Sequence, residues 1–307
     1  MLRYVSMRMV GAIPTLLLVI VIAFLMVHAA PGGPFDAERV LPPEIESNIT
    51  RAYHLDESLP QQFLRYVGGL LHGDLGPSYR YRDYSVSELI GSAFPVSLRL
   101  GLTAMAVALL LGISAGLVAA LRKNTFLDRL LTGIAMTGIS VPIFVVAPLL
   151  VLGFAVHLNW LPAGWSSSSG ISRYLLPVFA LALPQIAFIT RITRGGMIEV
   201  MTSDFVRTAR AQGLDTLTIV RYHALKPAML PLLSYMGPAV VGILTGSVVV
   251  EQIFGIPGLG QLFVRAALNR DYTLVLGIVI LYAVLIILFN LLVDILYGLL
   301  EPRMRKR

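Results

Sequence analysis

The sequence of 307 residues is 56% hydrophobic and 13% charged, and its mean hydropathy is +0.79. A water-soluble domain carries about a quarter charged residues, so this composition excludes an ordinary soluble protein and predicts one that buries its surface in lipid. Cysteine is absent, which excludes disulfides, thiolate metal sites and cysteine nucleophiles. The net charge of +7 would suggest a nucleic-acid partner in a soluble protein.

The first predicted element is the apolar run from Met9 to Ala29, which follows Arg3 and Arg8. The tripeptide Val-His-Ala at 27–29 resembles a small-residue cleavage site, so a cleaved signal peptide is one interpretation. The apolar core of a signal peptide has only about 7–15 residues, and this run is longer. We therefore favour an uncleaved first membrane helix.

Six segments, this one included, reach the ~20 mostly apolar residues that a spanning helix needs. Backbone groups in hydrocarbon must be satisfied within the segment, which favours helices, and prolines inside these runs are tolerated in membrane bundles. The predicted fold is an all-α membrane protein with six transmembrane helices at residues 9–29, 95–121, 130–156, 174–192, 229–250 and 274–300.

The basic residues between these segments predict the orientation of the chain. The segments 1–8, 122–129, 191–228 and 301–307 together hold 15 of the 24 Lys and Arg residues and five acids. The long segment 31–94, on the other side, holds five Arg and nine acids. Because Lys and Arg are enriched in cytoplasmic loops, both termini are predicted to be cytoplasmic. Topology thus explains the positive charge, and no nucleic-acid partner is expected.

The segments divide the chain into three parts. Residues 1–30 form the first transmembrane helix, and residues 31–94 form a periplasmic insertion. This insertion is too long for a simple connector and is expected to pack as short helices against the membrane face. Residues 95–307 form a core of five transmembrane helices with the cytoplasmic loop 191–228.

Catalytic motifs give little support for an enzyme. No Gly-Lys dipeptide occurs, so the chain cannot bind ATP through a P-loop, and the five histidines make no metal-ligand spacing. Gly112 to Gly116 matches the nucleophile-elbow pattern G-x-S-x-G, which requires a strand-to-helix turn. Here it lies in an apolar helical run, where small residues four apart, as also at Gly242 and Gly246, let membrane helices pack closely. We expect no catalytic residue and no metal site.

Asp294 is an acid deep in the last predicted span, and such a residue is a candidate functional group. A proton relay would need partners at membrane depth, and no other predicted span supplies a carboxylate or histidine near its midplane. We therefore favour a structural pairing of Asp294 with an Arg at the cytoplasmic end or with polar helix neighbours. A charge relay is the alternative.

The loop 191–228 carries the most informative local pattern. Ser203 and the following Asp can cap a short helix that runs to Gln212, and Gly213 stands where a left-handed residue ends such a helix. Asp215 or the next residue can cap a second helix, which is predicted to end before Pro227. The loop is thus predicted as helix, glycine turn, helix.

Small residues and arginines share the first of these two helices. Small side chains let a backbone seat closely in a partner's groove, while arginines offer fork-shaped donors at its rim. The alternative is a basic loop that lies on anionic headgroups. The ordered caps and the central Gly213 favour a rigid docking element.

The loop sequence FVRTARAQGLDTLTIVRYHALKPAMLP resembles the cytoplasmic EAA loop of binding-protein-dependent ABC importer permeases. Gly213 falls on the Gly of that motif and Ala209 on its second Ala, while Arg207 and Thr208 replace its Glu-Ala. The RTARAxG form is the one usual in the peptide and nickel branch. The segments HAAPGGPF, HGDLGPSYRYRDYSV and GSVVVEQIFGIPGLGQLFVRAALNRDY agree, so the resemblance covers essentially the whole chain. The insertion 31–94 resembles that of the B-type subunit of oligopeptide permeases.

This resemblance implies the type I ABC importer permease fold and a permease subunit of an ATP-driven oligopeptide importer in the bacterial inner membrane. The chain would bind no cofactor, since ATP and Mg would be used by two partner ABC ATPase subunits. Further implied partners are a C-type permease homologue, a periplasmic or lipid-anchored peptide-binding protein, and the lipid bilayer. The residues implied to dock on the ATPases are Arg207, Thr208, Ala209, Arg210, Gly213 and Leu214.

The segment 251–260 is rich in Pro and Gly and lies on the predicted outer side. We interpret it as a periplasmic gate or a contact for the binding protein, with a plain turn as the alternative; its residues of interest are Glu251, Pro257, Gly258 and Gly260. The translocation pathway is expected beside the third to fifth helices, where Pro and Gly are frequent.

Three rival functions remain open from the sequence. A permease for dipeptides, nickel or another small solute would belong to the same family. A self-sufficient secondary transporter would be expected to show an internal repeat and paired intramembrane ionisable groups, and neither is evident. A membrane-embedded enzyme would need a polar catalytic pair at depth, and the G-x-S-x-G match lacks a base.

Overall fold

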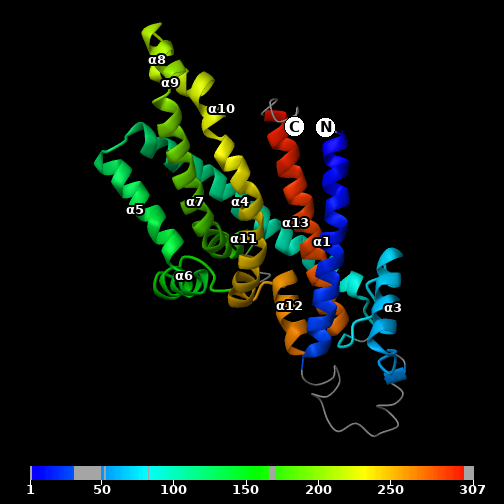
Figure 1. Cartoon of the computed structure of the whole chain (residues 1–307). Helices are drawn as coiled ribbons and strands as arrows, with labels where there is room; N and C mark the ends of the chain where they lie inside the picture. Colours follow the sequence, from blue (N-terminus) through cyan, green and yellow to red (C-terminus); the bar gives the residue numbers. More distant parts are fainter. Residues whose placement is uncertain (1, 31–49, 52, 82, 166–169, 301–307) are drawn as a thin grey trace. The chain divides into compact units, whose positions relative to one another are not determined.

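The computed structural model describes residues 2–30, 50–51, 53–81, 83–165 and 170–300, and within them the regular structure is helical apart from one isolated bridge between Pro77 and Ser85. The long helices (Figure 1) are α1 (Leu2–Ala29), α4 (Val86–Leu121), α5 (Phe126–Ser140), α7 (Leu175–Met201), α11 (Leu230–Phe254) and α13 (Tyr272–Leu300). The short ones are α3 (Leu59–Leu71), α6 (Ile143–Leu150), α8 (Asp204–Ala211), α9 (Thr216–Ile219), α10 (Leu225–Ala228) and α12 (Leu259–Leu268). Single turns of other helix types lie at Val151–His157 and Val220–Ala224, both π-helical, and at Ser172–Tyr174, a 3-10 turn.

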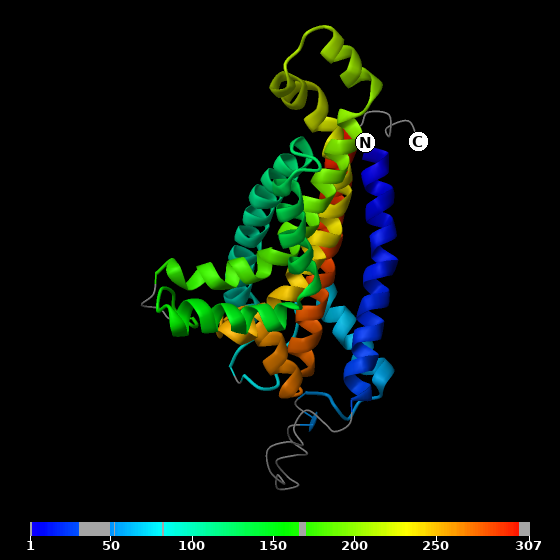
Figure 2. The same ribbon diagram turned by 90° about the vertical axis from the view of Figure 1, so that its left-hand side faces the viewer.

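Within these described residues, five helices are long and apolar enough to cross a membrane: α1, α4, α7 with its preceding turn, α11 and α13. The predicted span 130–156 corresponds to a pair of helical segments, Phe126–Ser140 and Ile143–His157, which is bent by 108° at the break between them. Figure 2 shows α6 running across the direction of α5. The six predicted spans are therefore five continuous helices and one bent pair.

The bend has a local cause at Val141 and Pro142. Proline disfavours the helical conformation in the residue before it, and Val141 is extended, with φ −93° and ψ 120°. Pro142 then serves as the N-cap of α6, where its missing N–H costs nothing. The sequence analysis treated this proline as tolerated inside one helix, and here it separates two.

α4 and α7 depart furthest from their predicted limits. α4 begins at Val86 rather than near residue 95, because Ser85 and Glu88 form a reciprocal cap: Ser85 N donates to Glu88 Oε2 (2.8 Å) and Glu88 N to Ser85 Oγ (3.2 Å). α7 continues to Met201, so residues 191–201 of the predicted loop are helical.

By its internal packing the chain divides into two compact units. The first comprises residues 1–8, 97–256 and 286–307, and the second residues 9–96 and 257–285.

In the first unit, α4 and α7 approach each other closely at the G-x-S-x-G stretch. A Cβ added at Gly112 would lie 2.7 Å from Ile189 Cβ, and one at Gly116 would lie 2.6 Å from Thr193 Cβ. Real Cβ atoms do not come so close, so only glycine permits this helix contact. The predicted packing role of these two glycines is confirmed.

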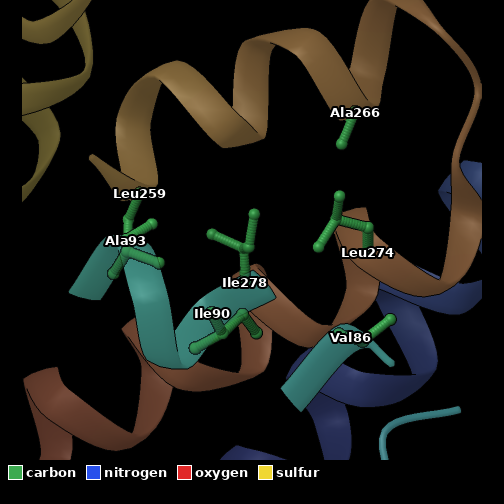
Figure 3. Close-up of a cluster of buried hydrophobic side chains, with 7 residues drawn as sticks. All are labelled: Val86, Ile90, Ala93, Leu259, Ala266, Leu274 and Ile278. Carbon is green, nitrogen blue, oxygen red and sulfur yellow. The ribbon is translucent and has the colours of Figure 1, made fainter. Parts of the chain in front are cut away.

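In the second unit, a buried apolar cluster joins the start of α4, the helix α12 and the start of α13. Figure 3 shows its seven side chains pointing toward one another: Val86, Ile90, Ala93, Leu259, Ala266, Leu274 and Ile278. This cluster positions α12, a short helix that the sequence analysis did not predict.

Asp271, just before α13, ties the turn between α3 and α4 to the same unit. Its fully buried carboxylate accepts hydrogen bonds from Ser78 Oγ, Tyr79 N (3.1 Å) and Arg80 N (3.3 Å), and from Leu274 N (3.2 Å) in the first turn of α13. One side chain thus caps a helix and fixes a turn that lies almost 200 positions earlier.

α1 presents most of its apolar side chains outward. From Met9 to Ala29 only Ile20 and Phe24 are buried, whereas residues such as Met26 are exposed. α3 packs beside this stretch, with the Phe63 ring edge-on to Phe24 at 5.2 Å between centroids. An apolar helix with a mostly unburied surface is what a lipid environment allows.

Candidate functional site

The segment between α7 and α11, residues 202–229, contains α8, α9 and α10 and is called the α8–α10 loop below. α8 begins after Ser203, which has the extended backbone of an N-cap residue, although its hydroxyl donates to Val200 O (2.6 Å) rather than capping α8. α8 ends in a Schellman motif: Gly213 N donates to Arg210 O (3.0 Å) and Leu214 N to Ala209 O (3.2 Å). Gly213 has φ +84°, so the predicted left-handed glycine is confirmed.

Asp215 is the N-cap of α9. Its Oδ2 accepts from Leu217 N (3.1 Å) and Thr218 N (3.2 Å). These donors, with the Thr218 side chain as the largest cause, hold the pKa of Asp215 below its ordinary value. The second helix is not continuous as predicted: a π-helical turn at Val220–Ala224 follows α9, and α10 runs through Pro227 to Ala228.

A small core holds the loop together. Val206, Ala209 and Ile219 are buried against one another and against Val200, Met201 and Leu214. A second cluster of Met197, Val220, Ala224 and Ala228 joins the end of the loop to α7. Because both clusters include residues of α7, the loop is a packed extension of that helix, and a force on it is carried into α7 and, through α10, into α11.

The structure separates the six predicted docking residues by exposure. Arg207, Thr208, Arg210 and Gly213 are exposed, Leu214 is half-buried, and Ala209 is buried in the loop core. Arg207 makes a surface ion pair with Asp204 at 3.3 Å. Ala209 therefore holds the loop together from within, and the other five have surface available to a partner.

Three apolar side chains on the loop were missed by the sequence analysis. Phe205, Leu217 and Tyr222 are 47%, 75% and 69% exposed, although each lies in a short helix that also contributes buried apolar residues to the loop. The sequence did contain a signal for their exposure, because each is an apolar residue on the polar face of an amphipathic helix.

The four residues of the predicted outer gate occupy different environments. Glu251 is fully buried within α11, which extends to Phe254, and its Oε1 accepts a hydrogen bond from Ser97 Oγ (2.7 Å). Gly258 and Gly260 are buried and Pro257 is exposed. In this conformation only Pro257 is available to an outside partner, so a gating role for the other three stays a prediction.

Asp294 forms an ion pair with Arg8, with 2.9 Å between Oδ2 and Nη1 and a hydrogen bond of 3.1 Å from Nη2 to Oδ1. The expected structural pairing of Asp294 with an arginine is therefore confirmed. Arg8 lies near the N-terminal end of α1, and Asp294 lies near the C-terminal end of α13. In the described part of the chain, no group of three His, Cys, Asp or Glu side chains is arranged to hold a metal ion.

Comparison with known proteins places these features in a family. Residues 108–306 match the family model of the binding-protein-dependent transport system inner membrane component, and residues 1–100 match the model of the N-terminal part of such membrane components. The oligopeptide transport system permease protein OppB of Escherichia coli is 54% identical, over 99% of this chain and 100% of that protein. The dipeptide transport system permease protein DppB of Bacillus subtilis is 40% identical, over 99% of this chain and 98% of that protein.

Solved structures agree on the fold. A chain of the inward-facing MetNI methionine ABC transporter has a TM-score of 0.57 and 17% identity, covering 69% of this chain and 96% of that chain. A chain of an amino acid ABC transporter gives a TM-score of 0.52 and 21% identity, over 69% of this chain and 94% of that one. With the match over most of the chain, these findings show that the protein belongs to the family of binding-protein-dependent transport system inner membrane components and has the type I ABC importer permease fold.

Proposed function

We propose that this chain is the B-type permease subunit of an ATP-driven oligopeptide importer and forms half of the translocation pathway. The observation that carries the substrate class is the identity of 54% to an oligopeptide permease over the whole chain, against 40% to a dipeptide permease. Such a subunit transports rather than catalyses, and it binds no cofactor of its own.

The free energy for transport would come from two ABC ATPase subunits that use ATP and Mg. A chain without a P-loop receives this energy through contact, and the α8–α10 loop is built to receive it. Its core is continuous with α7, so closure of an ATPase pair against the loop would tilt α7 and α11 together and alternate the access of the pathway.

The docking surface on the ATPases would combine a polar and an apolar part. The polar part is Arg207, Thr208, Arg210 and Gly213, and the apolar part is Phe205, Leu217 and Tyr222. Exposed apolar anchors bordered by arginines have the composition of a protein interface. Ala209 and Leu214 would act by keeping this surface in shape.

The remaining partners would be a C-type permease homologue and a periplasmic or lipid-anchored peptide-binding protein. The distribution of basic residues supports a cytoplasmic position for the α8–α10 loop and for both termini. The binding protein would then approach from the side of Pro257. Glu251 of α11 would be one gate residue, and Gly258 and Gly260 at the start of α12 would be others.

Purification and reconstitution test this function together. The chain, co-expressed with its partners, should bring down two ATPases and one homologous permease. In proteoliposomes, with its binding protein outside, it should take up labelled tetra- and pentapeptides only with ATP and Mg. Uptake by the chain alone, driven by an ion gradient, would show a self-sufficient carrier instead.

A dipeptide permease is the second candidate, because the Bacillus subtilis relative matches over the same length. The same vesicles distinguish the two. Competition by unlabelled dipeptides but not by tetrapeptides would favour the dipeptide permease.

A further inference from the structure

A cavity of about 270 Å³ lies between α5 and α7, inside the first unit. The two helices are antiparallel here: Asp128 in the first turn of α5 pairs with Arg194, while Gly138 near the other end of α5 lies against Ala187. The cavity therefore has one end near the α8–α10 loop and the other near the end of α5 and the middle of α7.

The end near the loop is polar and basic. Arg191 and Thr190 of α7 line it together with Thr132 of α5. Arg194 also lines it, but the Nε/Nη2 edge of its guanidinium is occupied, since these two atoms donate to Asp128 at 2.6 and 2.9 Å. Thr132 is likewise engaged, through its hydroxyl bond to Asp128 Oδ1 (3.3 Å).

Unlike Arg194 and Thr132, the side chains of Arg191 and Thr190 make no bond to Asp128. Among the described residues, no carboxylate lies within ion-pair distance of Arg191, an exposed residue of α7 that lines the cavity. The Thr190 hydroxyl is buried, with the residue 2% exposed, and has no hydrogen-bond partner among the described residues. A buried hydroxyl without a partner costs free energy, and the exposed guanidinium beside it can bring a negatively charged acceptor to the same place.

The opposite end of the cavity is apolar. Ala135 and Ile139 of α5 and Ala187 of α7 line it, and the surrounding surface of α5 exposes Ile134 and Met136. A peptide carries N–H and C=O groups along its whole length, and this end offers them no partner. A ligand that carries its charge at one end and hydrocarbon at the other fits both halves.

We propose that this cavity binds one anionic phospholipid, with its phosphate on Arg191 and Thr190 and an acyl chain along Ala135, Ile139 and Ala187. Arginine recognises phosphate through paired N–H donors, and the Thr190 hydroxyl supplies a further donor to an oxygen. The polar end faces the side that the basic residues predict to be cytoplasmic, where anionic lipids are attracted to basic groups. The proposal does not depend on which solute the protein transports.

The test uses the full complex, delipidated and placed in nanodiscs of equal phosphatidylglycerol and phosphatidylcholine, with retained lipid counted by native mass spectrometry. The wild type should keep one tightly held phosphatidylglycerol. Arg191→Gln should weaken its retention about tenfold, the effect of losing one charged hydrogen bond. Arg191→Lys should retain more than Gln, and Thr190→Val should give a smaller loss. Arg129→Gln, an exposed arginine of α5 that does not line the cavity, is the matched control and should change nothing.

Two further measurements complete the test. The first distinguishes a lipid headgroup from free phosphate, and the second identifies the occupant of the cavity without removing Arg191 or Thr190. Inorganic phosphate at the same concentration should not raise the melting temperature of the wild-type complex as phosphatidylglycerol does. Because the chain has no cysteine, Met136→Cys carrying a photo-crosslinker reports what enters the cavity mouth. Retention without headgroup preference, unchanged retention in Arg191→Gln, or crosslinking to a peptide or a subunit instead of lipid would each overturn the proposal.

Discussion

Asp128 and Arg194 form a bidentate ion pair between α5 and α7, with Nε–Oδ1 and Nη2–Oδ2 distances of 2.6 and 2.9 Å. The Asp128 side chain is 4% exposed, and it also accepts from Asn124 N (2.9 Å) at the turn before α5. The pair thus closes the turn from α4 and joins the bent helix pair to the helix that carries the α8–α10 loop.

Asp128→Ala should destabilise the permease by about 1–2 kcal/mol, because it removes the charged hydrogen bonds with Arg194, whose side chain is 29% exposed, and the acceptor of Asn124 N. The measurement is thermal unfolding of the purified complex, read as the melting temperature. Asp204→Ala is the control, since its pair with Arg207 is at the surface and such pairs contribute less than about 1 kcal/mol. Equal effects of the two substitutions would contradict a structural role for the buried pair.

Gly213→Val and Gly213→Asp should abolish transport while membrane insertion stays intact. A branched residue at φ +84° is strained by about 1–2 kcal/mol, enough to open the Schellman turn and to displace the face formed by α8. Uptake and co-purification of the ATPases are the readouts. Gly73→Val is the matched control, because Gly73 has φ +77° with equally open surroundings but lies outside the loop. Normal uptake by either Gly213 variant would refute the docking assignment.

Leu217→Asp should lower ATPase co-purification and uptake at least tenfold without lowering the melting temperature, because an exposed side chain contributes to a contact and not to the core. Leu217→Met keeps the apolar surface and should behave as the wild type. If Leu217→Asp transports normally, the apolar part of the docking surface is wrong, whatever the result for Gly213.

Asp294→Asn should leave uptake largely unchanged, since the amide can still accept a hydrogen bond from the Arg8 guanidinium in place of the partly exposed ion pair. Uptake at equal protein levels is the measurement. A complete loss would restore the charge-relay alternative, and Arg8→Gln would then separate loss of the pair from loss of the carboxylate.

The parts that sequence reasoning predicted well are those with local causes. The Gly213 turn and the Asp215 cap follow from residues within three or four positions of each other, and both are present. The start of α4 had an equally local signal, the S-x-x-E spacing of Ser85 and Glu88, which the hydropathy of the run concealed. The bend at Pro142 was ambiguous, because prolines inside membrane helices have no single outcome.

Features that depend on distant parts of the chain could not be predicted. The burial of Glu251 requires Ser97, and the role of Asp271 requires the turn at Ser78, neither of which is near in sequence. Likewise, the sequence analysis used Arg191 only as one of the basic residues that predict the orientation of the chain. Its place beside a cavity appears only once α5 lies against α7.

The bond between Ser78 and Asp271 also sets an order of events in time. The two residues are 193 positions apart, so a ribosome adding about 5–20 residues per second makes the second about 10–40 s after the first. During that interval four further apolar segments enter the membrane while the turn at Ser78 has no carboxylate to hold it. The second unit is therefore completed only when α13 is made, and a chain truncated before Asp271 would insert most of its spans yet leave this turn without its carboxylate.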